Sequence, residues 1–226
     1  MGDGSGMRQD FERWEVLVRD EARVGVLYRL LESNVLLTRI LVEGDGEPYR
    51  AESRVRLEPG NGSWELSWYR DRNLGVAKLM RREPQGLPSG SMPSYGDILM
   101  LFKAIEEPGN RLRYWRLNEA AWDAQDANGH LGAEPNAHIQ RVGALEQLPI
   151  PLGAAVSTHR YEAWADGVLV ATHWIDEGNE LVCTLWGGDL HSYRVPGTAS
   201  EAGWMSLSGL DDGTVEFMTR GFDAGS

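Results

Sequence analysis

Strict alternation of apolar and polar positions is the clearest pattern in this chain, and it predicts antiparallel strands. The regular example is Tyr49–Leu57, where arginine or glutamate occupies every second position. A strand with one apolar and one charged side is typical of a sheet with one face in water. Similar segments, separated by turn residues, cover 22–31, 35–43, 64–70, 74–81, 112–117 and 138–142. We therefore expect four or five strands in meander order before residue 82.

Helical spacing is clear only in residues 94–107. Ser94 is a candidate N-cap, Asp97 follows three positions later, and Pro108-Gly109 ends the pattern. The apolar stripe consists of Ile98, Leu101, Phe102 and Ile105. We expect this helix to cover the sheet, with a mobile lid over a pocket as the alternative. Residues 11–20 fit either period, and we expect a short helix or an extended lead-in there.

The remaining segments complete the predicted architecture. Residues 118–137 are polar and aperiodic, which predicts a long surface loop, and residues 204–210 and 214–219 predict a final hairpin around Asp212-Gly213. We expect residues 1–10 to be a flexible segment and residues 11–226 to form one domain. Its predicted fold is mainly β, an antiparallel meander barrel or half-barrel of about ten strands with the covering helix at 94–107.

Residues 156–195 hold three of the five histidines and the only cysteine, and three turns divide them into four strands. Asp166-Gly167 favours a two-residue type I′ turn. An unbroken register from that turn places Tyr161 opposite Thr172 and His159 opposite Trp174. A four-residue loop at 176–179 then continues the same faces into the next strand.

The register sorts these side chains into an apolar inner face and a mixed outer face that carries His173. The inner face comprises His159, Tyr161, Val168, Val170, Thr172, Trp174, Leu181, Cys183 and Leu185. For the last strand, a three-residue loop would place His191, Tyr193 and Val195 inside, and a two-residue loop would place Leu190, Ser192 and Arg194 there. We favour the former, because Tyr193 and Val195 suit an interior.

Polar side chains on an apolar inner wall suggest a ligand site, and our first hypothesis is binding of a small hydrophobic or amphiphilic molecule. The candidate ligand-binding residues are Trp64, Trp68, His159, Tyr161, Thr172, Trp174, Cys183, Leu185 and Tyr193. A cofactor-independent cyclase, isomerase or hydratase is the second hypothesis, with His159 as general acid or base and Tyr161 polarising a carbonyl or donating a proton. A protein-interaction module using residues 118–137 is the third. The plain structural alternative is that His159 and Tyr161 only hydrogen-bond within the core.

Composition and motifs argue against nucleic-acid binding, a membrane span and a metal or cofactor site. The net charge of −12 argues against nucleic-acid binding, and no run of about 18 apolar residues is present to span a membrane. The opening residues lack a signal peptide, so we expect a cytoplasmic protein. Cys183 has no second cysteine with which to form a disulfide. The predicted register places His159 and His173 on opposite faces, which argues against a metal site, and no cofactor-binding motif occurs. We therefore expect neither a metal nor a cofactor. Glu119 and Asp123 are possible positions for acid–base chemistry.

Residues 148–195 resemble small bacterial open β-barrel families of lipocalin-like or lipoprotein-like character and unknown function. The resemblance lies in the Pro-Ile-Pro-Leu-Gly entry at 149–153 and in the Trp-Ile-Asp-Glu-Gly corner at 174–178. It covers about a fifth of the chain and implies an antiparallel barrel or half-barrel, often concerned with lipid-like molecules. No catalytic residue can be transferred from it.

Overall fold

The computed structural model describes residues 10–43, 47–59, 63–72, 78–83, 86–119, 132–151, 153–195 and 210–222. The N-terminal half contains β1 (Phe11–Arg19), β2 (Ala22–Glu32), β3 (Val35–Val42), β4 (Tyr49–Leu57), β5 (Trp64–Asp71) and β6 (Lys78–Arg81). The middle contains β7 (Ser91–Pro93), the 3-10 turn η2 (Ser94–Gly96), α1 (Asp97–Glu106), β8 (Arg111–Asn118) and β9 (Gly132–Leu148). The C-terminal part contains β10 (Val156–Ala165), β11 (Val168–Asp176), β12 (Leu181–Trp186), β13 (His191–Arg194) and α2 (Asp212–Arg220).

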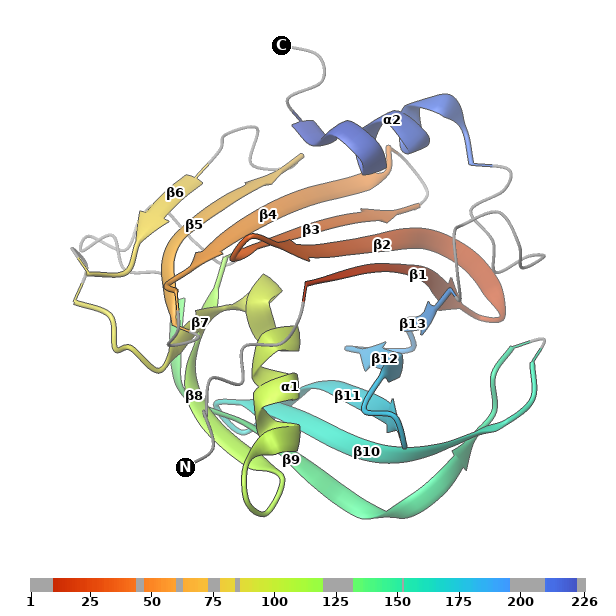
Figure 1. Ribbon diagram of the computed structural model, residues 1–226. Helices are drawn as coiled ribbons and strands as arrows, with labels where there is room; N and C mark the ends of the chain where they lie inside the picture. The colour runs from red at the N-terminus through yellow and green to blue at the C-terminus, as the bar shows by residue number, and fades with distance from the viewer. Residues whose placement is uncertain are drawn as a thin grey trace.

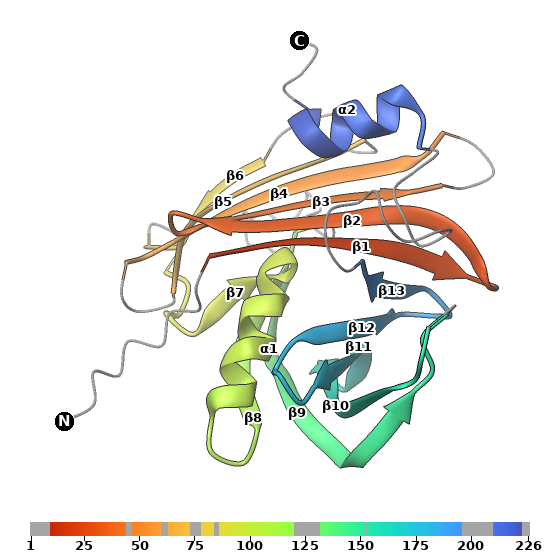
Figure 2. The ribbon, with the colours of Figure 1, turned by 45° about the vertical axis from the view of Figure 1, so that its right-hand side comes forward.

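All thirteen strands belong to one sheet, in the order β6-β5-β4-β3-β2-β1-β13-β12-β11-β10-β9-β8-β7. Two meanders are joined where β1 pairs with β13, and every pair is antiparallel except β7 with β8. The sheet curls around α1, with β1–β5 on one side of the helix and β8–β12 on the other (Figures 1 and 2). The mainly β meander is confirmed, but within the described residues the edge strands β6 and β7 do not pair, so the sheet is not closed.

Helix α1 fills the concave side of the curled sheet. Its buried side chains are Ile98, Met100, Leu101, Phe102 and Ala104. They join one apolar cluster with residues of both meanders, such as Val55 on β4 and Ile139 on β9. The helix predicted at 94–107 is confirmed, although Gly96, not Ser94, occupies its N-cap position. The chain makes a 3-10 turn at Ser94–Gly96 before the α-helix begins, which moves the N-cap two positions along.

Side chains connect the two ends of the sheet where backbone pairing is missing. Trp64 on β5 is fully buried, and its Nε1 donates to Ser91 Oγ on β7 at 3.0 Å. The carboxylate of Glu119, just after β8, accepts hydrogen bonds from Ser67 Oγ on β5 at 2.7 Å and from Ser53 Oγ on β4 at 3.0 Å. Glu119 is only 1% exposed. Its carboxylate therefore connects the two ends of the sheet from a buried position rather than facing solvent at a rim.

The outer, convex face of the sheet carries α2 over β2–β4 (Figure 1). This helix replaces the predicted strand at 214–219; residues 204–209 lie outside the described residues. Arg39 on β3 donates from Nη1 to the carbonyls of Met218 and Thr219, both at 2.9 Å, which satisfies the C-terminal end of the helix. Glu52, on the supposedly solvated side of β4, is consequently fully buried. The amphipathic pattern of that strand is correct, but the C-terminal end of α2 covers Glu52, whereas Arg56 on the same side stays exposed.

Two other expectations are settled by the backbone. Residues 11–19 form strand β1, so the extended interpretation of this segment is correct. The predicted loop at 118–137 is wrong at its end, because residues 132–137 already belong to strand β9, which pairs with β8 and β10. The central part of that segment, residues 120–131 with Asp123, lies outside the described residues.

Candidate ligand-binding site

The β10–β11 hairpin begins as predicted and then changes register. Ala165 pairs with Val168 and Trp164 with Leu169, as the type I′ turn requires. The next pair, however, is Ala163 with Ala171, so Val170 is an extra residue that forms a β-bulge. A shift of one residue moves every later side chain of the strand to the opposite face.

The shift corrects the predicted pairs and faces. Tyr161 pairs with His173, not with Thr172, and His159 pairs with Ile175, not with Trp174. Tyr161 and Ile175 belong to the cluster around α1, so His173 points to the concave side. Alternation then places four predicted inner residues on the convex side: Thr172, Trp174, Cys183 and Leu185.

The final strand follows the same correction. Trp186 N bonds to Leu190 O at 2.8 Å, so the loop has three residues, as predicted. Tyr193 shares a face with Cys183, also as predicted, but this is the convex face. The concave face instead presents Ser192 and Arg194, the pair assigned to the rejected loop length.

The sequence-predicted site residues do not converge. Trp64 is enclosed in the core, whereas Trp68 lies on the convex side, 4.9 Å from the Arg54 guanidinium carbon. His159 and Tyr161 do lie on the same face. His159 Nδ1 lies 2.7 Å from Arg141 Nη2, and the Tyr161 hydroxyl donates to Asn110 Oδ1 at 3.1 Å. Catalysis by His159 and Tyr161 stays a prediction.

A buried polar network that the sequence did not reveal occupies the concave face of β1, β2 and β13. Glu15 is 0% exposed and accepts from Arg13 Nε at 2.8 Å, from Ser192 Oγ at 2.6 Å and from Arg29 Nη1. Burial opposes ionisation of this carboxyl group, but the guanidiniums of Arg29 and Arg13 outweigh it and lower the Glu15 pKa to about 2. Glu15 is therefore a carboxylate at neutral pH.

His173 extends this network along β11. Its Nδ1 lies 3.0 Å from Thr184 Oγ1, and its ring meets Trp186 edge-on with centroids 6.4 Å apart. Burial, followed by the positive charge of Arg29, lowers the His173 pKa to about 3, so the ring is neutral at pH 7. Within the described part of the chain, His173 Nε2 and Trp186 Nε1 are buried without a hydrogen-bond partner.

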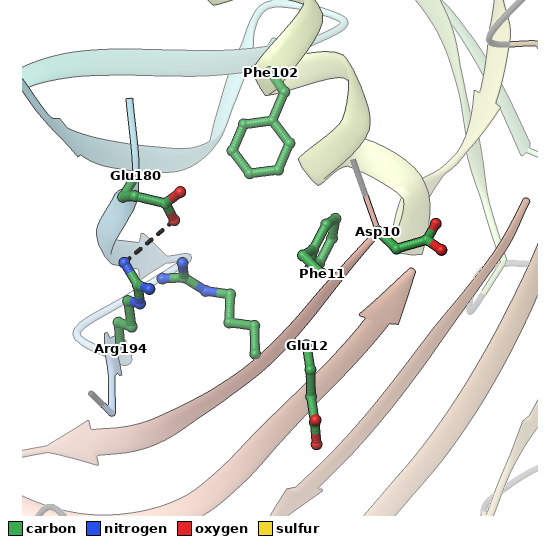
Figure 3. Close-up of a pocket in the computed structure, with 7 residues that line it drawn as sticks. Asp10, Phe11, Glu12, Phe102, Glu180 and Arg194 are labelled. Atoms are coloured by element: carbon green, nitrogen blue, oxygen red, sulfur yellow. Dashed lines mark ion pairs between the residues drawn. The ribbon is translucent and has the colours of Figure 1, made fainter. Parts of the chain in front are cut away.

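A pocket of about 380 Å³ opens beside this network. It is lined by Asp10, Phe11, Glu12, Arg13, Phe102, Glu180 and Arg194. Phe11 and Phe102 lie side by side in the lining (Figure 3). Their rings pack edge-to-face, with centroids 6.1 Å apart. Glu180 and Arg194 form an ion pair at 3.2 Å on another side, and the Glu12 carboxylate points away from the two rings. Arg13 belongs to both the pocket wall and the Glu15 network.

The pocket combines two aromatic rings with a buried guanidinium, the kind of surface that holds an amphiphilic molecule. No cluster of three or more metal-ligating side chains occurs among the residues that the structure describes. One sequence signal could have found the network: Arg13, Glu15 and Arg29 interrupt otherwise apolar strands. These side chains come into contact only through the β1–β2 register and the pairing of β1 with β13. Glu15 and Ser192, which bond across that pair, are 177 positions apart in the sequence.

Within the described ranges, no helix is long and apolar enough to cross a membrane. No protein-family model matches the chain, and neither the curated proteins nor the solved structures include a significant match. The resemblance of residues 148–195 to open-barrel families accordingly stays a prediction.

Proposed function

We propose that the protein binds a small amphiphilic molecule in the pocket between β1, α1 and β13. The observation that carries the proposal is one cavity of about 380 Å³ with Phe11 and Phe102 on one side and the buried Arg13 on another. Ligand pockets commonly begin at about 300 Å³ and combine an apolar wall with a few fixed polar groups. The site differs from the one expected from sequence, because α1 fills the space where a barrel interior would hold the ligand.

The two aromatic rings support an apolar contact. Phe102 is largely buried and comes from α1, whereas Phe11 is half-buried and comes from the first residue of β1. Rings held edge-to-face by different elements keep their position without a ligand. A bound alkyl or aromatic group would remove apolar surface from water at about 25 cal/mol per Å².

A neutral, environment-sensitive dye such as N-phenyl-1-naphthylamine tests the proposal. The full chain should bind it saturably, with one dye per chain and a strong rise in emission. Phe11→Ser should weaken binding at least tenfold, because it removes one of the two rings. Leu79→Ser is the matched control, since Leu79 is 54% exposed on the edge strand β6 and does not line the pocket.

Circular dichroism and thermal unfolding establish that both variants keep the fold. Equal loss of dye binding in Phe11→Ser and Leu79→Ser would contradict the proposal. So would emission that never saturates, because nonspecific adsorption has no defined stoichiometry.

A further inference from the structure

We infer that the molecule bound in this pocket carries an anionic group, a carboxylate or a phosphate, which binds Arg13 and Arg194. The inference rests on the proposed function and specifies the chemical class of its ligand. Three features of the described residues support it: the fixed position of Arg13, an excess of positive charge in the buried network, and the solvent-exposed ion pair of Arg194.

Arg13 is held in place by contacts on two of its three nitrogens. Nε donates to Glu15 and Nη2 donates to the carbonyl oxygen of Leu181. Among the described residues, no hydrogen bond of the remaining nitrogen, Nη1, is found, yet Arg13 is only 6% exposed and lines the pocket. A guanidinium oriented in advance loses little conformational entropy when it binds an anion.

The charges of the network do not cancel. Arg13 and Arg29 both contact the single carboxylate of Glu15, and His173 beside them is neutral at pH 7. One positive charge in the described part of this network is therefore without a countercharge. A buried charge without a partner is costly, so a bound anion would be stabilised strongly at this position.

Arg194 supplies a second guanidinium at the mouth of the pocket. Its ion pair with Glu180 is about 44% exposed on both sides, and pairs of this kind contribute little stability. Burial lowers the pKa of Arg13; Glu15 opposes the shift, and the like charges of Arg29 and Arg194 add to it. An anion between Arg13 and Arg194 would relieve this repulsion and accept charge-assisted hydrogen bonds from both.

Three acidic residues, Asp10, Glu12 and Glu180, also line the pocket, and Glu180 is already paired with Arg194. Glu12 points away from the rings and accepts from Trp14 Nε1 at 3.3 Å, and Figure 3 shows Asp10 directed away from the arginines. The overall charge of −12 repels anions at long range, so the local arginines decide the selectivity.

A matched decyl series tests the inference by isothermal titration calorimetry at pH 7.5 and low salt. The ligands are decanoate, decyl phosphate, decanol and decylammonium, which share one tail and differ in the head group. We expect decanoate or decyl phosphate to bind at least tenfold more tightly than decanol, and decylammonium to bind most weakly. The two anions distinguish a carboxylate ligand from a phosphate ligand.

Arg194→Gln should reduce affinity for the preferred anion about tenfold and leave decanol binding unchanged. Arg220→Gln is the control, because Arg220 lies on α2 at the convex side and its side chain is 70% exposed. Equal affinities for decanol and the anions, or an unchanged anion affinity in Arg194→Gln, would overturn the inference while the proposed function stands. If none of the four ligands binds, the proposed function itself fails, and the inference fails with it.

Discussion

The buried imidazole of His173 makes a specific prediction about acid sensitivity. This ring is 4% exposed, bonds to Thr184 through Nδ1, and has a pKa lowered from 6.5 to about 3 by burial and by the nearby Arg29. In the unfolded chain the same imidazole returns to its ordinary pKa. Between these two values the unfolded state binds more protons than the folded state, so stability falls as pH falls from about 6.5 towards 3.

The expected magnitude follows from this difference in protonation. At pH 5 the unfolded imidazole is almost fully protonated and the folded one is neutral, which costs about 2 kcal/mol relative to neutral pH. Glu15 adds little at pH 5, since its pKa is lowered from 4.5 to about 2 and its own contribution is lost only as pH falls from about 4.5 to 2. The His173 contribution is therefore the part of the pH 7 to pH 5 change that a variant lacking this imidazole does not show.

His173→Gln removes the titrating group while leaving an amide that can still bond to Thr184. Urea unfolding followed by tryptophan fluorescence gives the free energy of unfolding of both proteins at pH 7 and pH 5. The wild type should lose about 2 kcal/mol more than the variant between the two pH values. Burial raises the pKa of Asp97 and of Glu119. Their contribution to stability increases as pH falls, opposite in sign to that of His173, and it is the same in the wild type and the variant. Losses that agree within about 0.5 kcal/mol would refute the assigned protonation of His173.

Two further predictions concern the elements that hold the curled sheet. Glu119→Ala should lower the free energy of unfolding by about 3 kcal/mol, because it leaves buried hydroxyl and backbone donors without an acceptor. The control is Glu65→Ala, which removes an exposed ion pair and should change the free energy of unfolding by less than about 1 kcal/mol. Similar urea midpoints for the two variants would contradict the role of Glu119. Gly221→Ala should release α2, because the backbone there has a φ of +76° and an added Cβ would lie 1.9 Å from Glu52 Oε2. Hydrogen exchange should then accelerate in helix α2 but not in Gly90→Ala, where the added atom meets open space; unchanged protection in Gly221→Ala would show that α2 is held by other contacts.

The periodicity of the chain is sufficient to predict the local elements, because alternation and helical spacing are local properties. Tyr49–Leu57 is a strand with alternating faces, and residues 97–106 form the helix indicated by the stripe at 98, 101, 102 and 105. The turn at Asp166-Gly167 also formed as predicted, since these residues adopt positive φ values readily. Alternation and helical spacing act within a few residues and need no distant contact.

Which faces of these elements meet, and what covers them, became clear only from the assembled fold. The bulge at Val170 turns His173 inward, and nothing in the alternation of β11 announces an extra residue. Residues 212–220 form a helix, and Arg39 on β3 donates hydrogen bonds to the carbonyls at its C-terminal end. The network around Glu15 needs β1 to pair with β13 from the other end of the chain. These decisions depend on register between distant strands and on burial of charge, and both arise only when the whole sheet assembles.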